Sequence, residues 1–184
     1  MLLSLLCAAL GLLATVSHGL AAADFKLEPG FALLFNGKNL DGWREAKGSK
    51  ESLEGKTEAY HGRFKVNDGK LVYDPAVKGD SYIETTKEFG KDVHLKFEFM
   101  PGPKCNNDLF LRGIKFDIIP GNKENQAVKE GEWFTLEVIV KGEIIEHKIN
   151  GETVRTSKAG PKPTPFMLRA EIGAIQIRNL RVKE

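Results

Sequence analysis

The sequence predicts an all-β protein folded as a two-sheet antiparallel sandwich or jelly roll. Three observations indicate this class. Apolar and polar residues alternate with a period of two, turn sequences rich in Gly, Pro and Asn separate the alternating segments, and no window of a dozen residues has the apolar stripe of an amphipathic helix. Many short strands joined by such turns are typical of sandwiches and jelly rolls.

Two segments show the alternation most clearly, and each predicts a half-buried strand. In "KDVHLKFEFM" every second residue from Val93 to Phe99 is apolar, and the residues between them are polar. The segment "WFTLEVIVKG" repeats this pattern from Phe134 to Val140. Because successive side chains of a strand point to opposite faces, each segment has a core face and an outer face.

Turn sequences place the connections between strands. Asn150-Gly151 lies between "HKI" and "ETVRT", and these residue types accept the positive φ that a two-residue hairpin turn requires. Two further turns are indicated by Asn67-Asp68-Gly69 and Lys141-Gly142. Polar segments that we expect to be loops are 43–56, 123–133 and 157–165.

The first 23 residues predict a cleaved signal peptide. Residues 1–16 are almost wholly apolar, and the run Ala21-Ala22-Ala23 provides an A-x-A cleavage site. The apolar run is shorter than the roughly 20 residues that a membrane-spanning helix needs. We therefore expect an exported protein, periplasmic or extracellular, whose mature part, residues 24–184, is a single domain with no membrane span.

The net charge and the cysteine content limit which kinds of partner the protein is expected to bind and which interactions can stabilise its fold. A formal net charge of +2 is too small and too scattered to predict a nucleic-acid partner. After residue 23 the only cysteine is Cys105, so the mature chain cannot form an internal disulfide and must be stabilised by packing. No phosphate loop, dinucleotide fingerprint, zinc-type cysteine pattern, H-E-x-x-H or G-x-S-x-G motif occurs. The sequence does not indicate an oligomeric state.

One segment, "EFMPGPKCNNDLFLRGIKFD" (98–117), has a pattern that suits carbohydrate. If its two strands pair as a hairpin, five polar side chains converge on one sheet face: Glu98, Asp108, Arg112, Lys115 and Asp117. Carboxylates and a guanidinium can bind sugar hydroxyls in a bidentate way, and an aromatic ring can cover the apolar face of a pyranose. The alternative is a solvated outer face held by ion pairs.

Three more residues are candidates for the same site. Arg169 and Glu171 alternate with apolar residues in the penultimate strand and therefore face away from the core. His147 lies between Ile145 and Ile149 on its strand, where a partly buried histidine with satisfied hydrogen bonds is the alternative to a functional one. No two histidines have ligand spacing, so zinc is not expected, whereas a divalent cation bound by carboxylates stays open.

The order of motifs resembles the 3-keto-disaccharide hydrolase family, a domain first known without a function. The opening "GFALLFNGKNLDGW" is similar to the family's G-F-x-x-L-F-N-G-K-x-L-x-G-W stretch. Further segments resemble its later motifs in the same order and cover nearly all of the mature chain: "FKVNDGKLVY", "YIETTKEFGKDVHLKFEF", "NNDLFLRG", "GEWFTLEVIVKGEIIEHKINGETV" and "IQIRNLRVKE".

This resemblance implies a concanavalin- or LamG-like jelly roll, export, and cleavage of glycosides whose C3 hydroxyl a separate oxidoreductase has oxidised. The C3 ketone makes the C2 proton acidic, so a base can remove it and the group at C1 can leave. Such a site needs a base near C2, a group that stabilises the enolate at O3, and a proton donor for the leaving oxygen. It does not need the paired carboxylates of an ordinary glycosidase.

The resemblance also assigns residues. Glu98, Asn107 and Arg112 match family positions on the ligand face, and His147 matches the histidine before the N-G turn. Members often carry L-Q-D-H-G before the last strand, where this chain has Arg169, Ala170 and Glu171 in place of Gln, Asp and His. They also carry Y-E-V-Q after R-G, where Lys115 and Asp117 replace Glu and Gln.

Three candidate functions follow as expectations. The first is an exported enzyme that cleaves 3-keto-glycosides by elimination or hydrolysis, with Glu171 or His147 as the base and Arg112 or Lys115 holding the keto oxygen. Substrate would be bound by Glu98, Asn107, Asp108, Asp117 and Arg169. The second is a non-catalytic carbohydrate-binding module on the same face, since sandwiches host binding as readily as catalysis. A different exported hydrolase or an interaction domain is a third reading.

Overall fold

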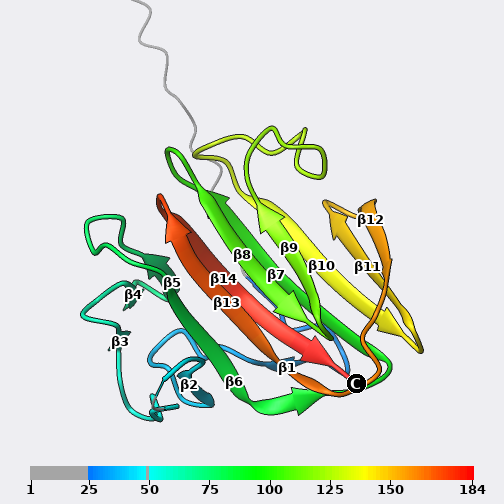
Figure 1. Ribbon diagram of the computed structural model, residues 1–184, viewed down its shortest axis with the longest axis horizontal. Helices are drawn as coiled ribbons and strands as arrows, with labels where there is room; N and C mark the ends of the chain where they lie inside the picture. The colour runs from blue at the N-terminus through cyan, green and yellow to red at the C-terminus, as the bar shows by residue number, and fades with distance from the viewer. Residues whose placement is uncertain (1–24, 49) are drawn as a thin grey trace, which may run out of the picture.

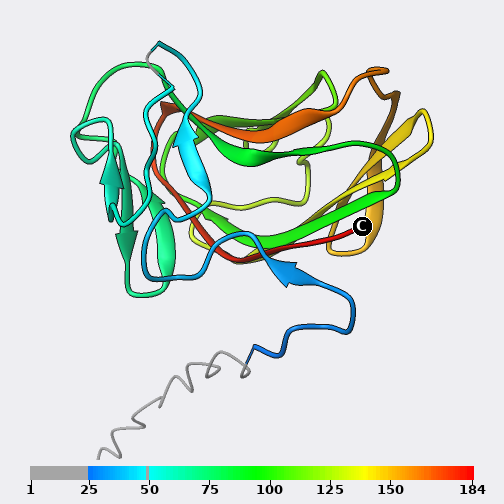
Figure 2. The ribbon, with the colours of Figure 1, turned by 90° about the horizontal axis from the view of Figure 1, so that it is seen from below.

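The computed structural model describes residues 25–48 and 50–184, and over this range the predicted all-β sandwich is confirmed. Two antiparallel sheets lie face to face, and the described residues form no helix (Figure 1). Figure 2 shows the two layers from the side. The predicted signal peptide, residues 1–23, lies outside the described range. No helix of the described residues is long and apolar enough to cross a membrane.

The larger sheet, sheet A, has nine strands. Its order is β12 (Glu152–Lys158), β11 (Ile144–Ile149), β10 (Phe134–Lys141), β7 (Val93–Pro101), β14 (Ile175–Lys183), β5 (Lys70–Tyr73), β4 (Phe64–Asn67) and β3 (Glu58–Ala59), with β1 (Ala32–Leu33) also paired to β14. The smaller sheet, sheet B, has five strands, in the order β2 (Trp43–Glu45), β6 (Ser81–Phe89), β13 (Thr164–Ile172), β8 (Asn106–Leu111) and β9 (Ile114–Ile118).

The apolar faces of the two sheets meet in one core. Every second residue of β7, from Val93 to Phe99, is at most 1% exposed, as the alternation predicts. From sheet B, Phe166 lies with its ring centroid 6.4 Å from that of Phe97 and 6.2 Å from that of Trp43. The contact with Phe97 crosses between the two sheets, and the contact with Trp43 lies within sheet B; both show which side of each strand faces the core.

The predicted hairpin turns are confirmed. Asn150 and Gly151 have φ values of 50° and 85° and join β11 to β12, with Ile149 paired to Glu152. The turns at Asp68-Gly69 and at Gly142 join β4 to β5 and β10 to β11. These turns set the register of the hairpins that they close, and β11–β12 has a register shift further along, between His147 and Lys148.

The predicted pairing between the strands at 98 and 108 is wrong. β7 pairs with β10 and β14 in sheet A, whereas β8 pairs with β13 and β9 in sheet B. The intervening segment, which includes Gly102 and Cys105, carries the chain from one sheet to the other. Both strands bury one face in the same core, so the alternation alone cannot distinguish a hairpin from a crossing between sheets. As a result, Glu98 lies in the opposite sheet from Asp108.

Candidate functional site

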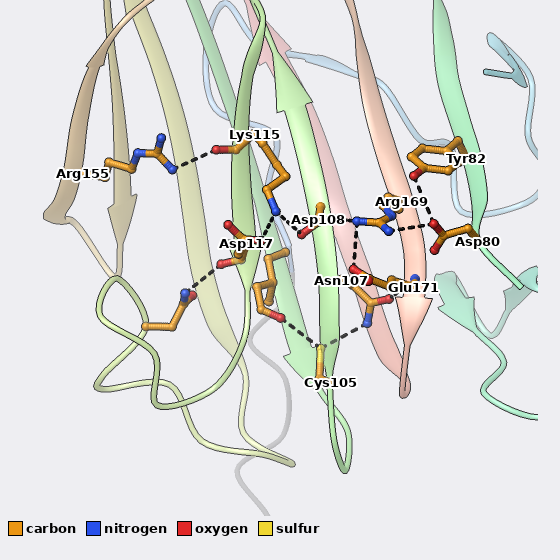
Figure 3. A network of polar contacts seen from close by, with 12 residues as sticks. Asp80, Tyr82, Cys105, Asn107, Asp108, Lys115, Asp117, Arg155, Arg169 and Glu171 are labelled. Carbon is orange, nitrogen blue, oxygen red and sulfur yellow. Dashed lines mark hydrogen bonds and ion pairs between the residues drawn. The ribbon is translucent and has the colours of Figure 1, made fainter. Parts of the chain in front are cut away.

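The outer face of sheet B brings five charged side chains into one network, which we call the polar face: Asp108, Lys115, Asp117, Arg169 and Glu171 (Figure 3). They come from three neighbouring strands, β8, β9 and β13. In the register, Asp108 lies directly opposite Asp117 on one side and Arg169 on the other. The alternation of the sequence points them outward because the residues between them, such as Leu109 and Phe116, fill the core.

Arg169 is the centre of one half of this network. Its Nη1 donates to Asp108 Oδ2 at 2.7 Å and lies 2.9 Å from Glu171 Oε2, while its Nη2 donates to Asp80 Oδ2 at 2.7 Å. The guanidinium also lies 5.5 Å from the ring centroid of Tyr82. Three carboxylates around one planar cation restrict its orientation.

Lys115 is the centre of the other half. Its Nζ donates to Asp117 Oδ1 at 2.5 Å and lies 3.8 Å from Asp108 Oδ1. That second oxygen of Asp108 is buried and has no hydrogen-bond partner among the described residues. The ammonium is therefore shared unequally between two carboxyl groups.

The two aspartates have pKa values shifted in opposite directions. Burial raises the pKa of Asp108 to about 6, and the facing Asp117 adds to the rise, while the hydrogen bond from Arg169 opposes it. Burial also acts to raise the pKa of Asp117, but the hydrogen bond from Lys115 and the facing carboxyl of Asp108 outweigh it, and the pKa is lowered. Of the two groups, Asp108 is therefore the one that takes up a proton first as the pH falls.

The exposed fractions of the side chains show which residues of the polar face a ligand can contact and which lie buried beneath them. The side chains of Lys115, Asp117 and Glu171 are 45%, 31% and 26% exposed, Arg169 is 17% exposed, and Asp108 is fully buried. Two residues further along the same strands, on the same face, Phe110 and Met167 are paired neighbours and partly exposed, and Phe110 lies opposite Lys115. The polar face therefore has an apolar platform at its side.

Asn107 supports this face from below. It is 1% exposed, accepts a hydrogen bond from the backbone N–H of Glu171 at 2.9 Å, and donates to the carbonyl of Ile172 at 3.1 Å. The predicted substrate-binding residue Asn107 is thus placed where it fixes the backbone under Glu171 and does not face a ligand.

Besides Asn107, three further predicted site residues do not join the polar face: Glu98, Arg112 and His147. The prediction that Glu98 and Arg112 converge there with the other charged side chains is wrong. Glu98 lies on sheet A, where it accepts hydrogen bonds from Arg178 and Asn179 at 2.7 and 2.9 Å. Arg112 is 2% exposed, and its guanidinium donates to the carbonyls of Gly160 and Gly90. Arg112 thus joins three connections at one end of the sandwich: β8–β9, where it lies, and β6–β7 and β12–β13, whose carbonyls it binds.

His147 is the third, and it lies inside the core. It is fully buried, and its ring stacks on Phe116 with centroids 4.5 Å apart. Neither ring nitrogen has a hydrogen-bond partner among the described residues. Burial, with a smaller contribution from the nearby charge of Arg155, lowers the pKa of His147 to about 4. The histidine is neutral and unsatisfied at neutral pH.

Sequence reasoning missed Asp80 and Tyr82, which extend the polar face towards β6. Tyr82 lies between the buried residues Ser81 and Ile83, and its hydroxyl donates to Asp80 Oδ2 at 3.4 Å. The sequence contains little indication of these two residues, because the start of β6 does not alternate between a buried and an exposed face. All five of its first residues are buried, including Tyr82 and Glu84, which face outward. Arg44 and Lys50, both 2.8 Å from Glu84, form a neighbouring ionic group on the same sheet.

The described residues do not form a metal site of the usual kind. No group of three or more His, Cys, Asp or Glu side chains in the described range could hold a metal ion. The carboxylates of the polar face are already paired with Lys115 and Arg169. The donor set therefore does not fit a divalent cation well.

The polar face is accessible at Lys115, Asp117 and Glu171, whose side chains are 26% to 45% exposed. Five hollows of about 410 to 660 Å³ in the described surface are lined by other residues. A ligand would lie along the sheet, over the strands that carry Lys115 and Glu171.

Comparison with solved structures shows the same fold in proteins of carbohydrate chemistry. A proposed glycosyl hydrolase from Parabacteroides distasonis has a TM-score of 0.64 at 17% identity, over 84% of this chain and 93% of that chain. The carbohydrate-binding module CBM66 from Bacillus subtilis has a TM-score of 0.55 at 13% identity, over 78% and 96%. The β-glucanase of Bacillus licheniformis has a TM-score of 0.54 at 10% identity, over 84% and 97%.

A search of curated protein sequences gives no match. A family model, in contrast, matches residues 30–121 and 113–183, almost all of the part that the structure describes. The jelly roll, the order of motifs and this match agree. The chain belongs to the family of 3-keto-α-glucoside-1,2-lyase-like domains.

Proposed function

We propose that the protein is an exported enzyme that cleaves 3-keto-glycosides on the polar face of sheet B. The observation that carries this proposal is the set of accessible carboxylates and cations that the structure gathers there, with Glu171 2.9 Å from Arg169 and Lys115 2.5 Å from Asp117. The family supplies the substrate class, and the polar face supplies groups of the kind that the reaction needs.

The chemistry assigns a role to each accessible side chain. Glu171 takes the proton from C2, the electron pair forms the C1=C2 bond next to the C3 ketone, and the C1–O bond breaks. The proton that Glu171 holds can then pass to the leaving oxygen, so the step balances. Lys115 and Arg169 stabilise the negative charge that develops on O3.

Glu171 replaces His147 as the preferred base because of access. His147 is enclosed by the core, whereas the Glu171 side chain is 26% exposed on the polar face. Arg112 is likewise buried, and its guanidinium donates to the backbone carbonyls of Gly160 and Gly90, away from the polar face. Phe110 and Met167 offer the apolar face of a sugar ring a surface beside Lys115.

A non-catalytic carbohydrate-binding module is the second candidate. The observation that favours it is the openness of the polar face, where every accessible carboxylate is already ion-paired. The fold similarity to CBM66 is consistent with it. In that case the same residues would bind sugar hydroxyls without removing a proton.

A turnover assay separates the two candidates. The mature protein is incubated with a 3-keto-disaccharide, with and without a chelator, and release of the second sugar is followed by NMR. We expect release that Glu171→Gln reduces by about 100-fold or more, the usual contribution of a general base. The matched control Glu143→Gln, a glutamate 73% exposed on sheet A, should keep full activity.

Two results would count against the enzyme. Saturable binding with no release assigns the chain to the binding module. Release that survives Glu171→Gln moves the base elsewhere. Export is tested separately, because the protein secreted by a bacterial host should begin near Asp24 when its N-terminus is sequenced.

A further inference from the structure

The edge strand β9 carries Lys115 and Asp117, two of the accessible side chains of the polar face. In sheet B only β8 pairs with it, because β9 is the last strand in the order. An edge strand leaves one row of its backbone N–H and C=O groups without a sheet partner. The position of both side chains therefore depends on what holds the free side of β9.

Side chains from outside sheet B hold that free side at two carbonyls. Arg155 Nη1 donates to the carbonyl of Lys115 at 2.9 Å (Figure 3), and Asn125 Nδ2 donates to the carbonyl of Asp117 at 2.8 Å. The two carbonyls belong to the residues whose side chains meet at the polar face. Between them, Phe116 points inward and stacks on His147.

The donors are themselves fixed by other contacts. Arg155 lies on β12, at the edge of sheet A, and its Nε donates to Ser157 Oγ at 3.1 Å. Asn125 lies in the connection between β9 and β10, is 1% exposed, and also donates to Asn122 Oδ1 at 2.7 Å. Sheet A, through Arg155, and this connection, through Asn125, thus hold the free side of β9 by hydrogen bonds.

We propose that Arg155 and Asn125 are positioning residues that set where Lys115 and Asp117 lie relative to Asp108. Neither donor is part of the polar face, and each acts through a backbone carbonyl of β9. The catalytic consequence rests on the proposed function, whereas the effect on the geometry of the polar face does not. Loss of either donor should let the free side of β9 move and weaken the contacts of Lys115 with both aspartates.

The test compares three variants of one strand. Arg155→Leu keeps much of the side chain's bulk and removes the donor, and Arg155→Lys keeps a charged donor group. Lys158→Leu changes an exposed residue of β12 whose ammonium lies 3.4 Å from Glu143 Oε2. The first readout is an NMR titration of the Asp108 carboxyl, which needs no sugar. The second is kcat and KM for a 3-keto-disaccharide.

We expect Arg155→Leu to shift the titration midpoint of Asp108 by about half a pH unit or more and to speed amide exchange in β9. It should lower kcat about 10-fold, with KM changed less, because a displaced Lys115 no longer meets the developing charge. Arg155→Lys should restore most of both effects, and Lys158→Leu should show neither. Asn125→Ala should reproduce the effects of Arg155→Leu and serves in its place if that variant does not fold.

Unchanged Asp108 titration and unchanged β9 exchange in both Arg155→Leu and Asn125→Ala would overturn the inference. A parent protein without turnover, in which Arg155→Leu still shifts the titration, would refute the proposed enzyme and support the positioning role.

Discussion

At the scale of single residues, the buried carboxyl of Asp108 organises the polar face. It accepts a hydrogen bond from Arg169 and lies 3.8 Å from the ammonium of Lys115, so it touches both cations that are proposed to meet the substrate. A carboxyl that is buried and faces a second one at Asp117 retains its proton to higher pH. Protonation of Asp108 therefore controls how firmly both cations are held.

Asp108→Asn tests this control. Asparagine keeps the shape of the side chain but cannot ionise, so the rise in turnover that we expect as the pH passes about 6 should disappear. Turnover at neutral pH should fall about 10-fold. The exposed Asp68→Asn, which removes only a pair with Lys70, is the matched control. A pH–rate profile of Asp108→Asn that matches the parent's would contradict this account.

Sequence alternation located most of the polar face but not all of it. Asp108, Lys115, Asp117, Arg169 and Glu171 could be predicted because each alternates with core residues of its strand. The same rule, applied to the apolar neighbours Ile145 and Ile149, places His147 inside, and the structure buries it completely. Arg112 could not be placed by alternation because it lies in a turn, with a φ of 51°.

At the scale of elements, hairpins could be predicted and crossings between sheets could not. The turn at Asn150-Gly151 has a local chemical cause, the positive φ of both residues. The passage from β7 to β8 has no such local signal, because the choice between sheets depends on which distant strands are available. In the structure β7 pairs with β10 on one side and with β14 on the other, so neither side is left for a hairpin partner.

Gly151→Ala tests the turn. With φ at 85° and no atom within 4 Å of an added Cβ, the substitution meets no clash, so only backbone strain opposes it. We expect the free energy of unfolding to fall by about 1 to 2 kcal/mol. In Gly90→Ala, where φ is not positive and the nearest atom is 3.8 Å away, it should change by less than about 0.5 kcal/mol. Denaturant unfolding measures both, and equal effects would contradict the turn geometry.

At the scale of the whole molecule, two buried groups make stability depend on pH in opposite directions. His147 has a pKa lowered to about 4, so its contribution to stability is present at neutral pH and is lost as the pH falls towards 4. Asp108 has a pKa raised to about 6, so its contribution is present in acid and is lost as the pH rises through 6. Between these values the two contributions largely cancel.

His147→Phe should remove one of the two contributions. As the pH falls from neutral to about 4, the free energy of unfolding of the parent should decrease by about 3 kcal/mol more than that of the variant. The comparison uses the change with pH, so a constant cost of fitting a larger ring into the core does not affect it. Parallel stability curves for the two proteins would show that His147 is not the buried neutral group described.

The central claim is that sugar binds on the outer face of sheet B, and a crystal structure of Glu171→Gln with a 3-keto-disaccharide tests it most directly. We expect the sugar along β8, β9 and β13, with Lys115 near O3, the amide of the substituted residue near C2, and a pyranose ring against Phe110. Sugar bound instead over Glu98 and Arg178 on sheet A would contradict the account.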